Sequence, residues 1–201
     1  MPELYRSLLP VFEQRWAAVA PKPVLEAARV LSKRIESWIQ SHLTGPRTLA
    51  HGDLRPDNFA FDESGEIVVF DWQTARHDPG SRDLAYFIAM ALPVEVRRAH
   101  EASLLDLYHQ TLLHYGVRNL GIDEVRTDYR RSIGSAVLRM VTAGALLDFS
   151  SERARQLVAA LMERINAGVE DHDFKSWGTH HANVPGLSLR PGCRSAPASP
   201  G

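Results

Sequence analysis

Apolar side chains recur every fourth residue in the first part of the chain, at Leu4, Leu8, Phe12 and Trp16. This spacing is typical of one face of an amphipathic helix that packs against the rest of the protein. Pro21 and Pro23 are expected to end this helix. A second apolar stripe predicts another helix from Val24 to about Leu43 and consists of Leu31, Ile35, Trp38 and Ile39. Both helices are interpreted as scaffold.

The second half of the chain is predicted to be almost wholly helical. The expected segments are Asp83 to about Leu92, Pro93 to Tyr115, Asp123 to about Phe149, and Ser150 or Ser151 to about Gly168. Gly116 suits a left-handed C-terminal cap, and Asp123 can cap the third segment. Gly134 and Gly144 weaken the prediction that this third segment is unbroken. The last helix is expected to bury Leu157, Ala160, Leu161 and Ile165.

Between these helical halves, the pattern changes to that of a β-hairpin. Two short apolar runs, Phe59–Phe61 and Ile67–Phe70, flank the turn-forming residues Asp62 to Glu66. The predicted fold class is therefore α+β and mostly helical. The residues from Gly178 to Gly201 are rich in Pro, Ser and Gly and are expected to form a disordered tail.

Composition narrows the classes of partner. The 23 Lys and Arg residues nearly balance the 24 Asp and Glu residues, so no global charge would attract nucleic acid or an anionic membrane. No signal peptide and no apolar run of roughly 18 residues occurs, and a soluble cytoplasmic protein is expected. The one cysteine, Cys193, lies in the tail, which excludes a disulfide framework. Oligomeric state is left open.

Candidate chemistry is concentrated between Leu49 and Gln73. This segment contains His51, Asp53, Asn58 and Asp71. Asp53 and Asn58 lie five positions apart in a loop that contains proline, and the hairpin would fold Asp71 back over that loop. Magnesium prefers hard oxygen ligands, which an amide and a carboxylate supply. The arrangement thus suits a magnesium ion and a phosphate donor beside a general base.

The spaced pattern resembles the catalytic loop and metal-binding aspartate of the kinase-like small-molecule phosphotransferases, the group of aminoglycoside phosphotransferases and choline kinases. Phe70–Gln73 followed by Ser81–Phe87 most resembles the ecdysteroid-kinase-like branch. The resemblance implies an ATP- and Mg²⁺-dependent transfer, with Asp53 as catalytic residue and Asn58 and Asp71 as metal and cofactor ligands. It also implies that His51 and Asp83 support the loop.

Two departures from protein kinases favour a small-molecule alcohol as acceptor. Protein kinases place Arg between the His and Asp of this loop, where it can pair with a phosphorylated activation loop, but this chain has Gly52. Trp72 and Gln73 stand where protein kinases have Phe and Gly after the metal-binding Asp. Control by an activation loop and a protein substrate are therefore not expected.

The resemblance extends from about Leu4 to Trp177 and concerns the large, C-terminal lobe of a kinase-like fold. Residues 1–177 are accordingly interpreted as one phosphotransferase domain. A glycine-rich loop and a strand bearing a nucleotide-binding lysine are missing before His51, since Lys22 lies near a proline and Lys33 within a predicted helix. The small nucleotide-binding lobe is thus expected to be absent, and the chain alone could be inactive.

Several residues have alternative interpretations. Asp57 suits a turn better than a metal site, and Asp83 also suits an N-cap. Arg55 could reach a phosphate but is more typical of a solvated loop side chain. His77, His100, His109, His114 and His180–His181 show no metal-ligand spacing and are interpreted as surface histidines. Besides a kinase, the alternatives are a non-catalytic pseudokinase-like binding module and, less favoured, a metal-dependent hydrolase.

Overall fold

A computed structural model describes residues 1–43 and 46–174 of the chain. The predicted tail, Cys193 and His180–His181 lie outside these residues. The helices are α1 (Pro2–Trp16), α2 (Lys22–Leu43), α3 (Ser81–Ala85), α4 (Val94–His114), α5 (Ile122–Leu146) and α6 (Glu152–Asp171). The strands are β1 (Thr48–Ala50), β2 (Phe59–Phe61), β3 (Ile67–Val69) and β4 (Arg76–Asp78). The prediction of a mostly helical chain with a small β component is confirmed.

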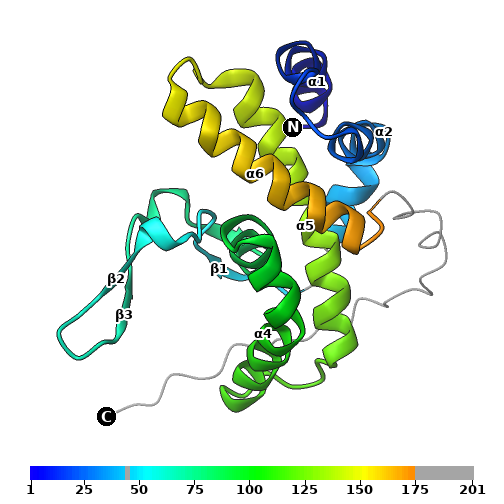
Figure 1. Cartoon of the computed structure of the whole chain (residues 1–201). Helices are drawn as coiled ribbons and strands as arrows, with labels where there is room; N and C mark the ends of the chain where they lie inside the picture. Colours follow the sequence, from blue (N-terminus) through cyan, green and yellow to red (C-terminus); the bar gives the residue numbers. More distant parts are fainter. Residues whose placement is uncertain (44–45, 175–201) are drawn as a thin grey trace.

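Helices α1, α2, α5 and α6 pack together around the main hydrophobic core (Figure 1). In α1, Leu8, Phe12 and Trp16 are buried as predicted. Leu4 was predicted wrongly, because it is 49 % exposed and Tyr5 fills the core beside it. The Tyr5 hydroxyl donates a hydrogen bond to the Ala28 carbonyl at 3.2 Å, so the polar end of this ring is satisfied against α2.

Helix α5 runs unbroken through the centre of the bundle despite its two glycines. A Cβ atom at Gly134 would lie 2.6 Å from Trp38 Nε1, and one at Gly144 would lie 2.8 Å from Phe12 Cδ2. Both glycines therefore allow aromatic side chains of α2 and α1 to lie directly on the backbone of α5. Their role is close packing rather than interruption.

The ends and faces of the last two helices differ in part from the prediction. Helix α5 starts one residue before Asp123, and the Glu124 carboxylate accepts a hydrogen bond from the Gly121 amide at 2.8 Å. The predicted cap at Asp123 is thus wrong. Ser151 caps α6 as predicted, accepting from the Ala154 amide at 3.2 Å. In α6, Leu157 is 49 % exposed, and the buried face is formed by Val158, Met162, Ile165 and Val169.

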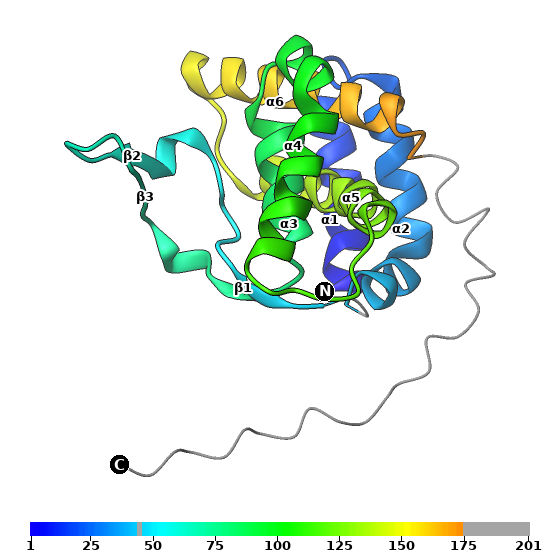
Figure 2. The same cartoon turned by 90° about the horizontal axis from the view of Figure 1, so that it is seen from below.

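The remaining elements position the loop between Ala50 and Phe59. Strands β2 and β3 form the predicted antiparallel hairpin, which extends away from the helices in both views (Figures 1 and 2). Strands β1 and β4 also pair antiparallel, with Ala50 opposite Arg76, which the sequence pattern did not predict. This pairing clamps the chain immediately before His51 to the chain that follows Asp71. A short π-helical segment, Tyr86–Ala91, continues α3.

The predicted left-handed cap of α4 is confirmed by Gly116, which has a φ of +88°. The Gly116 amide donates to Leu113 O at 3.1 Å, and the next amide, Val117 N, donates to Leu112 O at 3.0 Å.

Among the described residues, no helix is both long enough and apolar enough to cross a lipid bilayer.

Gly134→Ala is expected to destabilise the protein. Trp38 cannot retreat freely from a new Cβ, because its indole Nε1 donates to Arg131 O at 3.1 Å. Overpacking is expected to lower the free energy of unfolding by about 1–3 kcal/mol. The better helix propensity of alanine would raise it by at most about 1 kcal/mol, so the net effect is a loss. Gly168→Ala is the matched control, since its Cβ would lie 3.8 Å from Ala89 Cβ, an ordinary contact. Denaturant unfolding should show a loss for the first variant and no loss for the second; equal effects would contradict the close-packing role of Gly134.

His42 should make the stability depend on pH. The imidazole is 4 % exposed and stacks on Trp38, with ring centroids 5.0 Å apart. Burial, followed by the positive charges of Arg82 and Arg131, lowers the pKa of His42 from 6.5 to about 3. Since the unfolded chain takes up the proton first, stability is complete above pH 6.5 and falls as the pH drops towards 3.

His42→Phe keeps an aromatic ring against Trp38 but cannot be protonated. Its free energy of unfolding should therefore fall less steeply than that of the parent protein between about pH 6.5 and 4.5, above the range of ordinary carboxylates. His100→Gln, at an exposed position, should follow the parent curve. Parallel curves for the parent and His42→Phe would show that His42 is not the titrating group.

Candidate active site

The His51 side chain is enclosed in the loop, with 1 % of its surface exposed. Its Nδ1 accepts a hydrogen bond from the Asp53 amide at 3.2 Å, and its Nε2 lies 2.9 Å from the Phe70 carbonyl oxygen. Because the carbonyl can only accept, the two contacts together require a neutral imidazole with its proton on Nε2. The Trp72 ring packs edge-on against the same imidazole, with the ring centroids 4.8 Å apart. His51 thus ties the start of the loop to the end of the hairpin.

The Asp83 side chain binds the backbone at the start of the loop. Its carboxylate accepts a hydrogen bond from the His51 amide at 2.6 Å and another from the Gly52 amide at 2.8 Å. The alternative interpretation of Asp83 as an N-cap is wrong, because α3 already begins at Ser81. A carboxylate that accepts two amide hydrogen bonds is a strong anchor, since bonds to a charged acceptor are stronger than neutral ones.

Gly52 is required by its conformation and its neighbours. Its φ of +83° is the left-handed region, and a Cβ there would lie 2.6 Å from the Thr74 carbonyl oxygen. The Thr74 hydroxyl donates to the His51 carbonyl at 2.8 Å, so the turn after Asp71 lies directly on the loop. A larger residue at position 52 would push these two segments apart.

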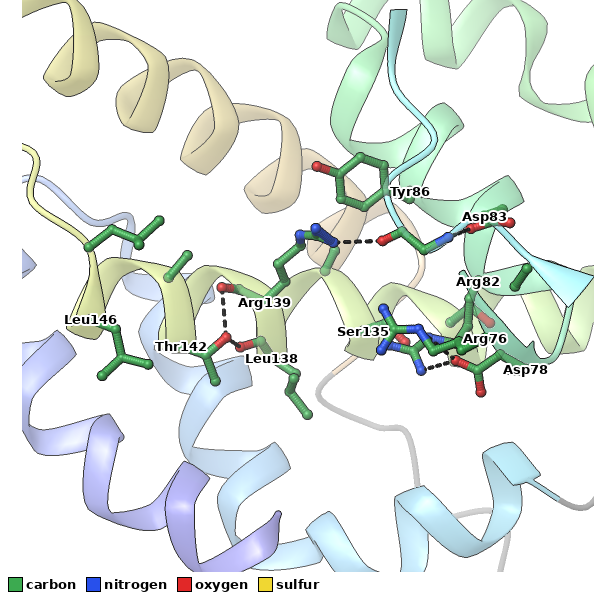
Figure 3. A pocket seen from close by; sticks show the side chains of 16 residues that line it. Arg76, Asp78, Arg82, Asp83, Tyr86, Ser135, Leu138, Arg139, Thr142 and Leu146 are labelled. Atoms are coloured by element: carbon green, nitrogen blue, oxygen red, sulfur yellow. Dashed lines mark hydrogen bonds and ion pairs between the residues drawn. The ribbon is translucent and has the colours of Figure 1, made fainter. Parts of the chain in front are cut away.

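The Asp53 carboxylate faces a cluster of donors. One oxygen accepts from Arg139 Nη2 at 2.9 Å, and the other lies 3.3 Å from Asn58 Nδ2. Arg139 also donates from Nη1 to the Gly52 carbonyl at 2.8 Å, and its guanidinium lies 4.6 Å from the ring centre of Tyr86, beside it in Figure 3. Arg55 lies 3.7 Å from Asp53, so it is not the isolated solvated side chain that was expected.

Asn58 and Asp71 occupy the two ends of the hairpin. Asn58 is 4 % exposed, and its amide nitrogen also donates to the Asp53 carbonyl at 2.9 Å, which leaves its side-chain oxygen available. The Phe70 amide donates to the Asn58 carbonyl at 3.1 Å and so brings Asp71 next to the loop. Asp71 is exposed and has a φ of +63°, an uncommon conformation for a residue other than glycine that concentrates at functional sites.

The donor set of these two side chains fits magnesium. An amide oxygen and a carboxylate are hard ligands, and magnesium commonly completes its coordination with water and substrate phosphates. Within the described residues, no group of three or more His, Cys, Asp and Glu side chains could hold a metal ion.

The expectation of surface histidines is wrong for His109, which is 9 % exposed and whose Nε2 lies 2.8 Å from the Leu120 carbonyl oxygen.

Arg139 is the site residue that the sequence interpretation missed. It lies 86 positions after Asp53, on a different element, so no local motif indicates the contact. One signal was present: Arg139 is the single charge within the otherwise apolar run from Ala136 to Val141. A charge in the inward part of a central helix indicates a buried partner.

The chain belongs to the ecdysteroid kinase-like family, whose model matches residues 1–121. The suspected branch is thereby confirmed, and at the level of the family the chain is a kinase-like phosphotransferase. The matched residues include the loop, the hairpin and Asp83, whereas Arg139 lies beyond them. Comparisons with curated proteins and with solved structures gave no match.

Asp83→Asn should loosen the loop. An asparagine can accept only one of the two amide hydrogen bonds through its oxygen, and its NH₂ group would face the other donor. The expected loss is about 2 kcal/mol of unfolding free energy, together with faster hydrogen exchange at the His51 and Gly52 amides. Asp123→Asn, at a side chain that is 93 % exposed, is the control. Unchanged exchange in Asp83→Asn would contradict the anchoring role.

Proposed function

We propose that this chain forms the large lobe of an ATP-dependent kinase that phosphorylates a hydroxyl group of a small molecule. The observation that supports this most strongly is the state of Asp53, whose carboxylate is held by Arg139 and Asn58 at the centre of the family's loop. Phosphoryl transfer needs little covalent chemistry from the protein, so an oriented carboxylate beside the acceptor hydroxyl is the main requirement. Asp53 orients that hydroxyl and accepts its proton.

Asn58 and Asp71 would hold Mg²⁺ through the Asn58 side-chain oxygen and the Asp71 carboxylate. Bound there, Mg²⁺ supplies positive charge that offsets the charge on the transferred phosphoryl group. His51 and Asp83 keep the loop in place, because both bind its backbone rather than its open side. Arg139 acts from α5 by fixing the direction of the Asp53 carboxylate.

The second candidate is a non-catalytic, pseudokinase-like binding module. It is favoured by the content of the residues before β1, where α1 and α2 occupy most of the chain and Lys22 and Lys33 both lie in α2. Neither lysine stands on a strand over the loop. The kinase hypothesis therefore predicts weak ATP turnover by the chain as given. It predicts stronger turnover by a form that is extended upstream of Met1 with a lysine-bearing strand.

Asp53→Asn should abolish most of the transfer activity. The measurement is Mg²⁺-dependent formation of ADP with a panel of hydroxyl compounds, using the most active form of the protein. The amide keeps the shape of the carboxylate but cannot accept a proton, so we expect a fall in kcat of about 10²–10⁴-fold with little change in thermal stability. Asp57→Asn is the matched control, because Asp57 lies in the same loop with its side chain 76 % exposed.

Calorimetry of Mg-ATP binding separates the two candidates. Binding of Mg-ATP with turnover that depends on Asp53 supports the kinase. Failure of the chain and of its upstream-extended form to bind Mg-ATP would instead favour the binding module, as would equal activity of Asp53→Asn and Asp57→Asn.

A further inference from the structure

A cavity of about 370 Å³ lies between α5 and the segment from β4 to Tyr86 (Figure 3). Gly52 and Arg139 form part of its wall. Gly52 immediately precedes Asp53 in the chain, and Arg139 donates a hydrogen bond to the Asp53 carboxylate. A molecule in this cavity would therefore lie directly beside the loop. The cavity is partly open to solvent.

One end of the cavity is rich in cationic groups. Arg76 and Arg82 gather around Asp78 there, and both guanidinium groups approach the same Asp78 oxygen (Figure 3). The Arg76 contact is 3.6 Å, which is too long for a hydrogen bond. A guanidinium has five N–H donors, so one carboxylate oxygen cannot satisfy two such groups. This end therefore has guanidinium N–H donors that have no acceptor among the described residues.

The charged residues that line the cavity are three arginines and two aspartates. Asp83 attracts the Arg82 guanidinium electrostatically, but its oxygens accept hydrogen bonds from the His51 and Gly52 amides, and among the described residues it accepts none from Arg76 or Arg82. The charge of Arg139 is balanced by Asp53. Burial lowers the pKa of the Arg82 guanidinium, and repulsion from Arg76 adds to this, although Asp78 and Asp83 oppose it. An added anion would relieve this repulsion.

The α5 side of the cavity supplies a hydroxyl and an apolar surface. Among the described residues, the Ser135 hydroxyl oxygen is buried and has no hydrogen-bond partner. Leu138, Leu146 and Leu147 line the same side, and Leu146 and Leu147 are 64 % and 55 % exposed at its edge. An unpartnered polar atom and exposed leucines in one cavity are features of a surface that a ligand completes.

We propose that this cavity binds the acceptor and that the acceptor is an amphipathic alcohol with an anionic group, held by Arg76 and Arg82, and an apolar body against the α5 leucines. The term acceptor rests on the proposed kinase function, whereas recognition of an anion does not. The hydroxyl to be phosphorylated would point to Asp53 along the wall formed by Gly52 and Arg139.

A pair of small ligands tests this directly by binding alone, without turnover. Cyclohexanecarboxylate and cyclohexanecarboxamide have nearly the same shape but differ in charge. In ligand-observed NMR titrations at low ionic strength, the carboxylate should bind the parent chain about 10-fold more tightly than the amide, as expected for a charge-assisted hydrogen bond. In Arg76→Gln this ratio should fall to near one. Arg126→Gln should keep it, because Arg126 has a similar exposure of 39 % on a distant surface.

Ser135→Ala provides a second variant that should fold normally, since the lost hydroxyl has no partner among the described residues. It should weaken both ligands, while the ratio between them remains. Equal binding of the two ligands to the parent, or the same ratio in Arg76→Gln as in Arg126→Gln, would overturn the proposal. Displacement of the carboxylate by Mg-ADP would overturn the acceptor assignment, because it would place the phosphate donor in this cavity.

These outcomes remain distinct from those of the proposed function. A chain that discriminates between the two ligands but never binds Mg-ATP retains the anion site and loses the kinase assignment. A chain that transfers phosphate but treats both ligands alike remains a kinase and loses the anionic acceptor.

Discussion

The geometry of the candidate site depends on one half-buried carboxylate that anchors the backbone of a loop. The segment between β1 and β2 has no regular structure around Asp53, so its amides need partners from elsewhere. Asp83 supplies them by accepting from the His51 and Gly52 amides. Asp83 lies in α3, and Ala85 and the residues Ile88–Met90 that follow it are buried, so the loop is tied to an element that packs into the hydrophobic core. Asp83 thus fixes the backbone that carries Asp53, and Arg139 then fixes the direction of the Asp53 carboxylate.

The same loop is also held by the hairpin and by the turn after it. His51 contacts the Phe70 carbonyl, and Thr74 donates to the His51 carbonyl. Asp71 lies between these two contacts in a left-handed conformation. Its backbone is thus fixed on both sides while its side chain remains exposed, which is the combination that a metal ligand facing a bound phosphate requires.

The sequence predicts the parts of this arrangement that depend on local patterns. The helices follow from apolar spacing, and the hairpin follows from turn residues between two short apolar runs. The pairing of β1 with β4 was not predicted because each strand has three residues, too few to show alternation. The packing role of Gly134 was not predicted, because the side chain that lies against it, Trp38, is remote in the sequence. Leu4 and Leu157 fit a helical stripe but fall at its edge, where spacing alone cannot separate core from surface.

Arg139 shows the limit of motif reasoning more clearly than any other residue. The loop motif identifies Asp53, yet the orientation of its carboxylate is set by a side chain of α5 that the family match does not reach. The basic end of the cavity belongs to the matched residues, whereas Ser135 and the apolar wall belong to α5. The proposed catalytic residue and the proposed anion-binding residues therefore lie on one segment, and the surface proposed to fit the rest of the acceptor lies on another. Changes in α5 could therefore alter which alcohol is bound without altering the loop, provided that Arg139 is kept.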